Sequence, residues 1–373
     1  MAVPFIDLKR FEEGFLDTWL EKVSAMSSRA EFISGNEVTT LESRLSECAQ
    51  VAHVISCANG TDAIQLALRA IGVGRGDIVL VPNMTFWATF EAVVNVNASP
   101  VTVDIDLTDG GIDLVAFKIA VEKFNPRAAV VAHLYGWGSA KLGELREYCK
   151  NQKVMLVEDG AQCFGAEYMG EPIYKGALIS TTSFYPAKVL GGAGDGGAVF
   201  TDDAEIAKRV RQLGNHGRTA HYGYGLVGWN SRLDSFQAAY LNISIDYLPQ
   251  RLKSRRESAA FYSKELLSLG LKQITAPDSY NENGYCNVCL IENEALKIKL
   301  ETALRSSGIG FGNIYPGAMS DQSGAVNFLH AHVGGSNAQQ LCTSVLNLPL
   351  FPYMVLEELT EVIDIVQSQI NKE

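Results

Sequence analysis

The chain has 373 residues, of which 47% are hydrophobic and 20% charged, and its formal net charge at pH 7 is −11. This composition is typical of a folded globular protein, so it excludes disordered, collagen-like and coiled-coil chains. The length predicts about two domains. The acidic excess disfavours contact with the phosphate backbone of DNA or RNA, and we expect no nucleic-acid partner.

Neither a membrane span nor an export signal is apparent. Apolar runs such as residues 154–157 are far shorter than the roughly 20 residues that cross a bilayer, so no membrane partner is expected. The first fifteen residues carry early acidic groups and lack the apolar core of a signal peptide. Seven cysteines, an odd number, are typical of a reduced protein, and a cytoplasmic location is expected.

Short apolar segments alternate with amphipathic ones through the first two thirds of the chain. We expect helices at residues 61–68, 85–94 and 141–150, and strands at residues 53–56, 78–81, 100–104, 129–134, 154–157, 180–185 and 197–201. Strands that alternate with helices predict an α/β fold with a mainly parallel, seven-stranded sheet covered on both faces.

The pattern changes near residue 245. A helix from residue 234 through 256 and beyond, kinked or broken at Pro249, leads into a second region. There a strand at residues 285–291 and helices at 295–306 and 356–370 indicate a smaller α+β unit. We therefore predict a large domain over residues 1–245 and a small C-terminal domain over residues 246–373.

Three short motifs match ligand-binding patterns but lack the necessary context. The run G-A-G-D-G-G at residues 192–197 is followed by a strand, whereas a dinucleotide fingerprint opens a helix, so a turn that passes close to a ligand is favoured. Cys286 and Cys289 are three apart on a strand and face opposite sides, which indicates buried thiols. His330 and His332 lack further ligands and are interpreted as surface residues, and no metal site is expected.

Several polar residues follow strands at the sheet edge where α/β proteins bind ligands. Gly60 and Thr61 open a helix whose amides suit a phosphate, Asp159 follows the fifth strand, and Ser183 and Lys188 share a loop after the sixth. Each also has an ordinary explanation as a helix cap or a solvated charge. Together they fit pyridoxal phosphate, which needs a lysine for its aldehyde, an acid at its ring nitrogen and a phosphate cradle.

In the same order, these motifs resemble those of the DegT/DnrJ/EryC1/StrS family of nucleotide-sugar aminotransferases. The matching segments are A-N-G-T-D-A at 58–63, P-N-M-T-F at 82–86, V-E-D-G-A-Q at 157–162, S-F-Y-P-A-K at 183–188 and G-W-N-S-R-L-D at 228–234. The resemblance extends from residues 4–8 to the final helix. It implies the fold type I architecture of aspartate aminotransferase, with pyridoxal 5′-phosphate as the cofactor.

The resemblance also implies roles for the residues around the cofactor. Phe86 would stack on its ring, or Trp87 if the match shifts by one position. Asp159 would pair with the ring nitrogen, Gln162 would lie near the ring hydroxyl, and Lys188 would be the catalytic residue that forms a Schiff base. The phosphate would be bound by Gly60, Thr61 and Ser183.

A homodimer with its active sites at the subunit interface is implied as well. Asn230 would reach the cofactor phosphate of the partner subunit, and Arg232 would bind a substrate carboxylate. Tyr315 would lie near the sugar, in a segment where family members often have Y-P-x-P-L-H. This chain reads I-Y-P-G-A-M-S at residues 314–320, which leaves the sugar pocket undefined.

The implied reaction moves an amino group from L-glutamate to a nucleotide-linked keto-sugar. Position 3 of a UDP-N-acetylglucosamine-derived ketone, for lipid A or O-antigen synthesis, is the first expectation, and a dTDP-linked keto-deoxysugar aminated at position 3 or 4 is the alternative. Lys188 favours transamination over the dehydration carried out by relatives with histidine there. A dehydratase and a non-catalytic regulatory protein remain as alternatives of another class.

Overall fold

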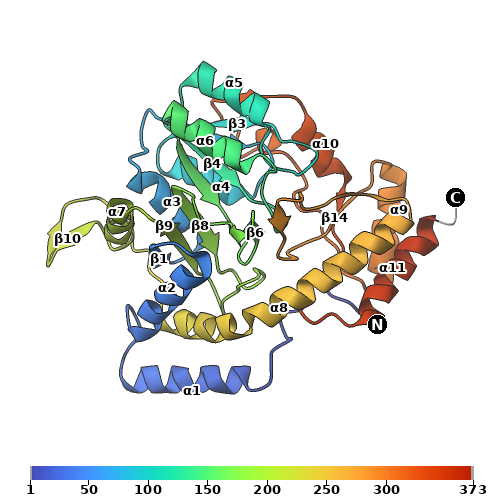
Figure 1. Ribbon diagram of the computed structural model, residues 1–373, viewed down its shortest axis with the longest axis horizontal. Helices are drawn as coiled ribbons and strands as arrows, with labels where there is room; N and C mark the ends of the chain where they lie inside the picture. Colours follow the sequence, from blue (N-terminus) through green and yellow to red (C-terminus); the bar gives the residue numbers. More distant parts are fainter. Residues whose placement is uncertain (1, 371–373) are drawn as a thin grey trace.

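The computed structural model of the protein describes residues 2–370 and is organised around one eight-stranded sheet (Figure 1). Its strand order is β1-β9-β8-β5-β4-β2-β3-β15, and only β9 runs antiparallel to its neighbours. These strands are β1 (His53–Cys57), β2 (Ile78–Pro82), β3 (Ser99–Val103), β4 (Ala128–Ala132), β5 (Met155–Asp159), β8 (Ile179–Ser183), β9 (Gly197–Thr201) and β15 (Ala331–Val333).

All seven predicted strands occur, but the predicted count is one short because β15 comes from far along the chain. Its residue Ala331 pairs with Val101 of β3 in parallel register. A three-residue strand next to glycines has no local pattern that distinguishes it from a loop. The α/β class and the mainly parallel sheet are confirmed.

Helices cover both faces of the sheet because side chains alternate along each strand. Val79 and Val81 contribute to one apolar layer, while Leu80, between them, contributes to the layer on the other face. The first layer packs against α3 (Gly60–Ala70), α4 (Trp87–Asn95) and α7 (Ala204–Gly214). The opposite face is covered by α2 (Asn36–Ala49), α5 (Leu114–Phe124), α6 (Leu142–Gln152) and part of α8 (Ser235–Ser268).

The 34-residue helix α8 connects the sheet to the C-terminal elements (Figure 1). Asp234 caps its first turn by accepting a hydrogen bond from the Gln237 amide, 2.8 Å away. Of the two outcomes expected at Pro249, a kink or a break, the break does not occur, because α8 is continuous through this position, although proline cannot donate the usual backbone hydrogen bond there. Leu248 and Leu252, on either side of it, are buried against the sheet layer, and this packing holds the helix together.

The C-terminal elements form a second core of their own. It joins the end of α8 to α9 (Glu294–Ser306) and α11 (Leu356–Ile370), and the N-terminal residue Val3 packs into it. The remaining elements are α1 (Phe15–Ser28), α10 (Asn337–Ser344), the 3-10 turn Met319–Asp321, β6 (Glu167–Tyr168), β7 (Glu171–Pro172), β10 (Arg218–Ala220), β11 (Gly223–Tyr224), β12 (Lys272–Ile274), β13 (Tyr280–Asn281), β14 (Val288–Leu290) and β16 (Val345–Leu346).

Two details bear on the expected second unit. The strand expected at 285–291 is shorter, since β14 spans only Val288–Leu290 and leaves Tyr285 in a loop. The boundary proposed at 245/246 lies within α8. Within residues 2–370, every helix is too short or too polar to cross a membrane.

Candidate active site

The phosphate-binding turn expected at Gly60 and Thr61 forms where β1 ends and α3 begins. Asn59 caps α3, its side-chain oxygen accepting a hydrogen bond of 2.8 Å from the Asp62 amide. The amides of Gly60 and Thr61 lie in the first turn, outside the intrahelical hydrogen-bond ladder and at the positive end of the helix dipole. They are therefore available to an anion.

Ser183, at the end of β8, lies directly against this turn. A Cβ atom added to Gly60 would be 2.7 Å from the Cβ of Ser183, so only glycine allows the approach. The glycine-rich run shapes the same place, because a Cβ on Gly197 would lie 2.4 Å from the Asn59 carbonyl oxygen. That run leads into β9 and not into a helix, so it is not a dinucleotide-binding fingerprint.

Asp159 is a buried carboxylate at the carboxyl end of β5. Its oxygens accept hydrogen bonds from the Thr89 hydroxyl at 3.0 Å and the Ala161 amide at 3.1 Å. Burial raises the pKa of Asp159, while these two hydrogen bonds and the charge of Lys188 act in the opposite direction. A cation brought to this carboxylate would remove much of the cost of keeping it charged.

Lys188 is brought near Asp159 by the pairing of β5 with β8. Asp159 lies opposite Thr181 in parallel register, and the chain continues from β8 into the turn that carries Lys188. The Lys188 amine is 3.4 Å from the hydroxyl of Tyr285 and 5.3 Å from the centre of its ring. Tyr285 belongs to the C-terminal part of the chain and was not predicted as a site residue.

Gln162 connects the loop after β5 to Tyr315. Its side-chain oxygen accepts a hydrogen bond of 2.7 Å from the Tyr135 amide, and its nitrogen donates to the Tyr315 hydroxyl. The Tyr135 hydroxyl in turn donates to the Ile314 carbonyl at 3.1 Å. Burial raises the pKa of Tyr315 well above its ordinary value, so its hydroxyl stays protonated. The structure thus joins two of the predicted site residues, Gln162 and Tyr315.

Of the two candidates for ring stacking, Phe86 is the one open to a ligand. Its side chain is 59% exposed, and its ring centre lies 6.4 Å from that of Tyr315. Trp87 instead packs against Phe90, with ring centres 5.1 Å apart, and lies against the apolar layer under α4. This difference follows from their positions, since Phe86 caps α4 and Trp87 is its first helical residue.

Asn230 and Arg232 lie on either side of Ser231, whose hydroxyl accepts a hydrogen bond of 3.2 Å from the Ala58 amide, two positions before Gly60. Both are exposed; Asn230 pairs with Asn215 along the backbone, and Arg232 donates to the Asn215 side chain at 3.2 Å. Within the described chain, neither side chain forms a hydrogen bond or ion pair with Lys188 or Asp159.

A buried ion network lies behind Asp159 on the other face of β5. Glu158 receives two hydrogen bonds from Arg146, at 2.7 and 2.8 Å, and lies 2.9 Å from His133 Nε2. Burial raises the pKa of Glu158, but the His133 and Arg146 contacts outweigh it and hold the pKa below its ordinary value. The backbone amide of His133 also donates to the Asp159 carbonyl at 2.9 Å, which links the network to the site.

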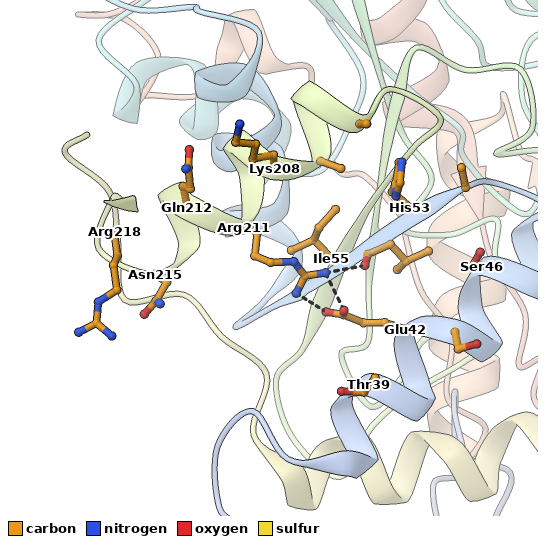
Figure 2. Close-up of a pocket in the computed structure, with 15 residues that line it drawn as sticks. Thr39, Glu42, Ser46, His53, Ile55, Lys208, Arg211, Gln212, Asn215 and Arg218 are labelled. Atoms are coloured by element: carbon orange, nitrogen blue, oxygen red, sulfur yellow. Dashed lines mark hydrogen bonds and ion pairs between the residues drawn. The ribbon is translucent and has the colours of Figure 1, made fainter. Parts of the chain in front are cut away.

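A groove of about 710 Å³ lies elsewhere on the described residues (Figure 2). It runs between α2, β1 and α7, and none of the predicted site residues lines it. Glu42 and Arg211 pair across it at 2.8 Å, Glu42 accepts from the Ser56 amide at 2.9 Å, and Arg211 donates to the Val54 carbonyl at 3.4 Å. These side chains bond to backbone groups of β1, the edge strand, and so protect groups that have no neighbouring strand to pair with.

The remaining motif predictions can now be compared with the structure. Cys286 and Cys289 are buried in separate apolar clusters and form no disulfide, which confirms their interpretation. His330 is exposed as expected, but His332 is half-buried on β15, where its Nδ1 lies 3.0 Å from the Thr102 hydroxyl. The surface interpretation of His332 was wrong because β15 was not predicted. No group of three potential metal ligands occurs among residues 2–370.

Sequence inspection also missed residues that only the fold brings to the site. Thr89 had one usable signal: Thr85 and Thr89 are one helical turn apart, and their hydroxyls lie 2.8 Å from each other. Tyr285 and Tyr135 had none, because their partners Lys188 and Gln162 are distant along the chain.

Comparison with known proteins agrees with this arrangement. A sequence profile of the DegT/DnrJ/EryC1/StrS aminotransferase family matches residues 17–367. The chain is 34% identical to a UDP-N-acetyl-3-dehydro-alpha-D-glucosamine 3-aminotransferase of Acidithiobacillus ferrooxidans, with 99% of this chain and 98% of the relative covered. It is 33% identical to a dTDP-3-amino-3,4,6-trideoxy-alpha-D-glucose transaminase of Streptomyces venezuelae, over 98% and 96%. The crystal structure of NtdA from Bacillus subtilis with bound cofactor PMP superposes with a TM-score of 0.91 at 26% identity, covering 99% of this chain and 85% of NtdA.

Proposed function

Because the chain belongs to the DegT/DnrJ/EryC1/StrS aminotransferase family, we propose that it transfers an amino group to a nucleotide-linked keto-sugar, with pyridoxal 5′-phosphate as its cofactor. The observation that carries this proposal is the convergence of a lysine amine, a buried carboxylate and a helix N-terminus at one edge of the sheet. Each group matches one part of that cofactor.

The cofactor fits the site in charge and in shape. Its phosphate suits the amides of Gly60 and Thr61, and the absence of a Cβ on Gly60 leaves Ser183 close enough to contribute its hydroxyl. Asp159 is buried and its pKa is raised, so its carboxylate would be stabilised by pairing with the protonated ring nitrogen of the cofactor. Phe86 is exposed beside Tyr315, where it could stack on the face of the cofactor ring. Gln162 could contact the side of that ring that carries the hydroxyl group.

When bound, the cofactor supplies an aromatic system that accepts the electrons left when a proton leaves the amino donor. Lys188 would hold it covalently and, once released, would take that proton on its ε-nitrogen and return it during transfer. Asp159 would keep the ring nitrogen protonated through its negative charge. Burial of Asp159 would exclude water from this pairing and so strengthen it.

The acceptor is proposed as position 3 of a UDP-N-acetylglucosamine-derived 3-keto sugar, with L-glutamate as the donor. The relative from Acidithiobacillus supports this choice, since it is similar over nearly the full length of both chains. The second candidate is a dTDP-linked keto-deoxysugar, supported by the Streptomyces relative at almost the same identity. Both candidates share a keto group on a sugar that carries a nucleotide, so the chemistry at Lys188 is common to them.

We also propose a cytoplasmic homodimer in which Asn230 of each chain reaches the cofactor phosphate of its partner. The exposure of Asn230 supports this proposal, as do exposed apolar side chains nearby. Ile33, 50% exposed, pairs with Asp234, and Tyr222 and Val227 are 77% and 85% exposed on the segment that projects beside α7 (Figure 1). Apolar surface around a polar site residue is typical of a subunit contact.

A single preparation tests the cofactor site and the acceptor together. The protein loaded with pyridoxal phosphate is reduced with borohydride and digested, and the modified peptide is mapped. We expect the label on Lys188, and a label on another lysine would contradict the site. A separate portion of the undigested protein, in its amino-loaded form, is incubated with UDP-linked and dTDP-linked keto-sugars. Mass spectrometry should show the aminated UDP product; exclusive formation of the dTDP product would select the second candidate.

A further inference from the structure

Tyr285 is the residue outside the predicted set that comes closest to the reacting lysine. Its hydroxyl is 3.4 Å from the Lys188 amine, and the amine also lies 5.3 Å from the centre of its ring. Among residues 2–370, Tyr285 is the one side chain that hydrogen-bonds to this amine. The contact joins the loop after β8 to a segment nearly 100 positions further on.

Buried polar contacts hold the backbone of Tyr285 in this position. Its amide donates to the Asn283 side chain at 2.9 Å, and the Asn283 nitrogen donates at 2.9 Å to the carbonyls of both Gln162 and Phe164. Asn283 is fully buried, so these hydrogen bonds are shielded from water. Tyr285 is thereby attached to the loop that follows Asp159.

A second anchor acts on the preceding residue. Arg255, buried on α8, donates to the carbonyls of Gly284 and Leu350, each 3.3 Å away. Gly284 has a φ of +67°, and a Cβ there would lie 2.6 Å from the Cβ of Arg255. Only glycine fits this approach, so the position of Tyr285 is built into the fold.

We infer that Tyr285 is a catalytic residue that binds the ε-amine of Lys188 whenever that amine is not bonded to the cofactor. This inference rests on the proposed role of Lys188. A phenol can accept a hydrogen bond from an amine or an ammonium group, and its ring face attracts a cation. A long, flexible lysine side chain loses its orientation once released, and Tyr285 returns it to one place beside Asp159.

The inference predicts which steps depend on the Tyr285 hydroxyl. Capture of pyridoxal phosphate by the cofactor-free full-length protein needs an oriented amine, and so does removal of the α-hydrogen of glutamate. Tyr285→Phe removes only the hydroxyl, and we expect it to slow both steps about tenfold, the upper end of what one hydrogen bond contributes. The KM for glutamate should stay unchanged, because Tyr285 is not proposed to bind the donor.

The experiment compares Tyr285→Phe with the matched control Tyr280→Phe. Tyr280 lies on β13, and its hydroxyl donates to the Ser139 carbonyl at 2.8 Å, so the control also loses a phenol hydrogen bond. Cofactor capture is followed by absorbance, hydrogen exchange by deuterium incorporation into glutamate, and folding by melting temperature. We expect the control to stay within about twofold of wild type.

Two results would overturn the inference. Wild-type rates of both steps in Tyr285→Phe would show that its hydroxyl is not used, and equal losses in Tyr280→Phe would show a general structural effect. Borohydride mapping of Tyr285→Phe distinguishes this failure from failure of the proposed function. A label on Lys188 with unchanged rates rejects only Tyr285, whereas a label elsewhere rejects the site itself.

Discussion

Glu158 and Asp159 are consecutive residues whose carboxylates enter opposite faces of β5. Glu158 contacts the Arg146 guanidinium and the His133 imidazole, whereas Asp159 accepts hydrogen bonds from two neutral donors. The two acids consequently have pKa values displaced in opposite directions, Glu158 downward and Asp159 upward. Glu158 therefore stabilises the fold through its ion pair, whereas Asp159 is available to a cationic ligand.

Replacing Asp159 with asparagine should stabilise the cofactor-free protein while it abolishes function. Because the pKa of Asp159 is raised, the folded state binds a proton more readily than the unfolded chain does. Between the ordinary pKa and the raised one, the free energy of unfolding therefore falls as pH rises. Asparagine cannot lose a proton, so in Asp159→Asn the free energy of unfolding does not fall in this way. We expect a melting temperature roughly 1–3 °C higher at neutral pH without cofactor.

The same variant should lose its response to pyridoxal phosphate. We expect turnover to fall by about 100-fold or more, since the ring nitrogen loses its carboxylate partner. Asp364→Asn, an exposed change on α11, serves as the control in thermal melts with and without cofactor. Wild-type turnover in Asp159→Asn would remove Asp159 from the proposed role.

Glu158→Gln should destabilise the protein at neutral pH by about 3 kcal/mol, because it leaves Arg146 without a charged partner in a largely buried site. The lowered pKa of Glu158 means that its stabilisation is present above its ordinary pKa and is lost as pH falls through the folded value. Urea denaturation should therefore show a difference from wild type that shrinks in acid.

A matched control for this change lies on α6, the helix that carries Arg146. Glu144 of α6 pairs with Lys118 at 2.7 Å, but both side chains are exposed. We expect Glu144→Gln to cost less than about 1 kcal/mol. Equal losses from the two substitutions would show that burial of the Glu158 network contributes nothing.

Gly60→Ala should weaken binding of the cofactor through its phosphate. The added Cβ would lie 2.7 Å from Ser183 and would force the turn and β8 apart. We expect affinity for pyridoxal phosphate to fall about tenfold or more, with little change for pyridoxal, which lacks the phosphate. Gly74→Ala, where the nearest atom is 3.7 Å away, is the control. Equal losses for both ligands would contradict a phosphate cradle at Gly60.

Mixing two inactive variants tests whether Asn230 acts on the partner subunit. Lys188→Ala removes the amine, and Asn230→Asp places a negative charge beside the proposed phosphate. In a mixed dimer, one site would combine an intact Lys188 with an intact Asn230, so random mixing should restore about a quarter of wild-type activity. If Asn230 acted within its own chain, the mixture would stay inactive.

Local sequence patterns were sufficient for most of the fold. The strands ending at Pro82 and Asp159 are apolar runs bounded by polar or breaking residues, and the final helix occupies residues 356–370 as predicted. The pattern failed at β15, where pairing with β3 makes a strand from three residues that have no periodicity of their own. At Pro249, where a kink or a break was expected, the helix is not broken, because the packing of its buried neighbours outweighs one missing hydrogen bond.

The site was predictable only in part, for a related reason. Gly60, Asp159 and Lys188 belong to motifs whose order along the chain identifies the family, and family membership is confirmed. Thr89, Tyr285 and His133 reach the site through contacts between distant segments, which no single motif contains. Asn230 and Arg232 match their motif, and their polar contacts among the described residues are with Asn215.

The pairing of β15 with β3 also constrains the order of events on the ribosome. His332 must lie beside Thr102, and 230 positions separate them, so the outer edge of β3 stays uncovered until residues 331–333 have been synthesised. A nascent chain that stalls before residue 331 would display this bare strand to its neighbours, a known route to aggregation. Synthesis of β15 is therefore the step that allows this edge of the sheet to close.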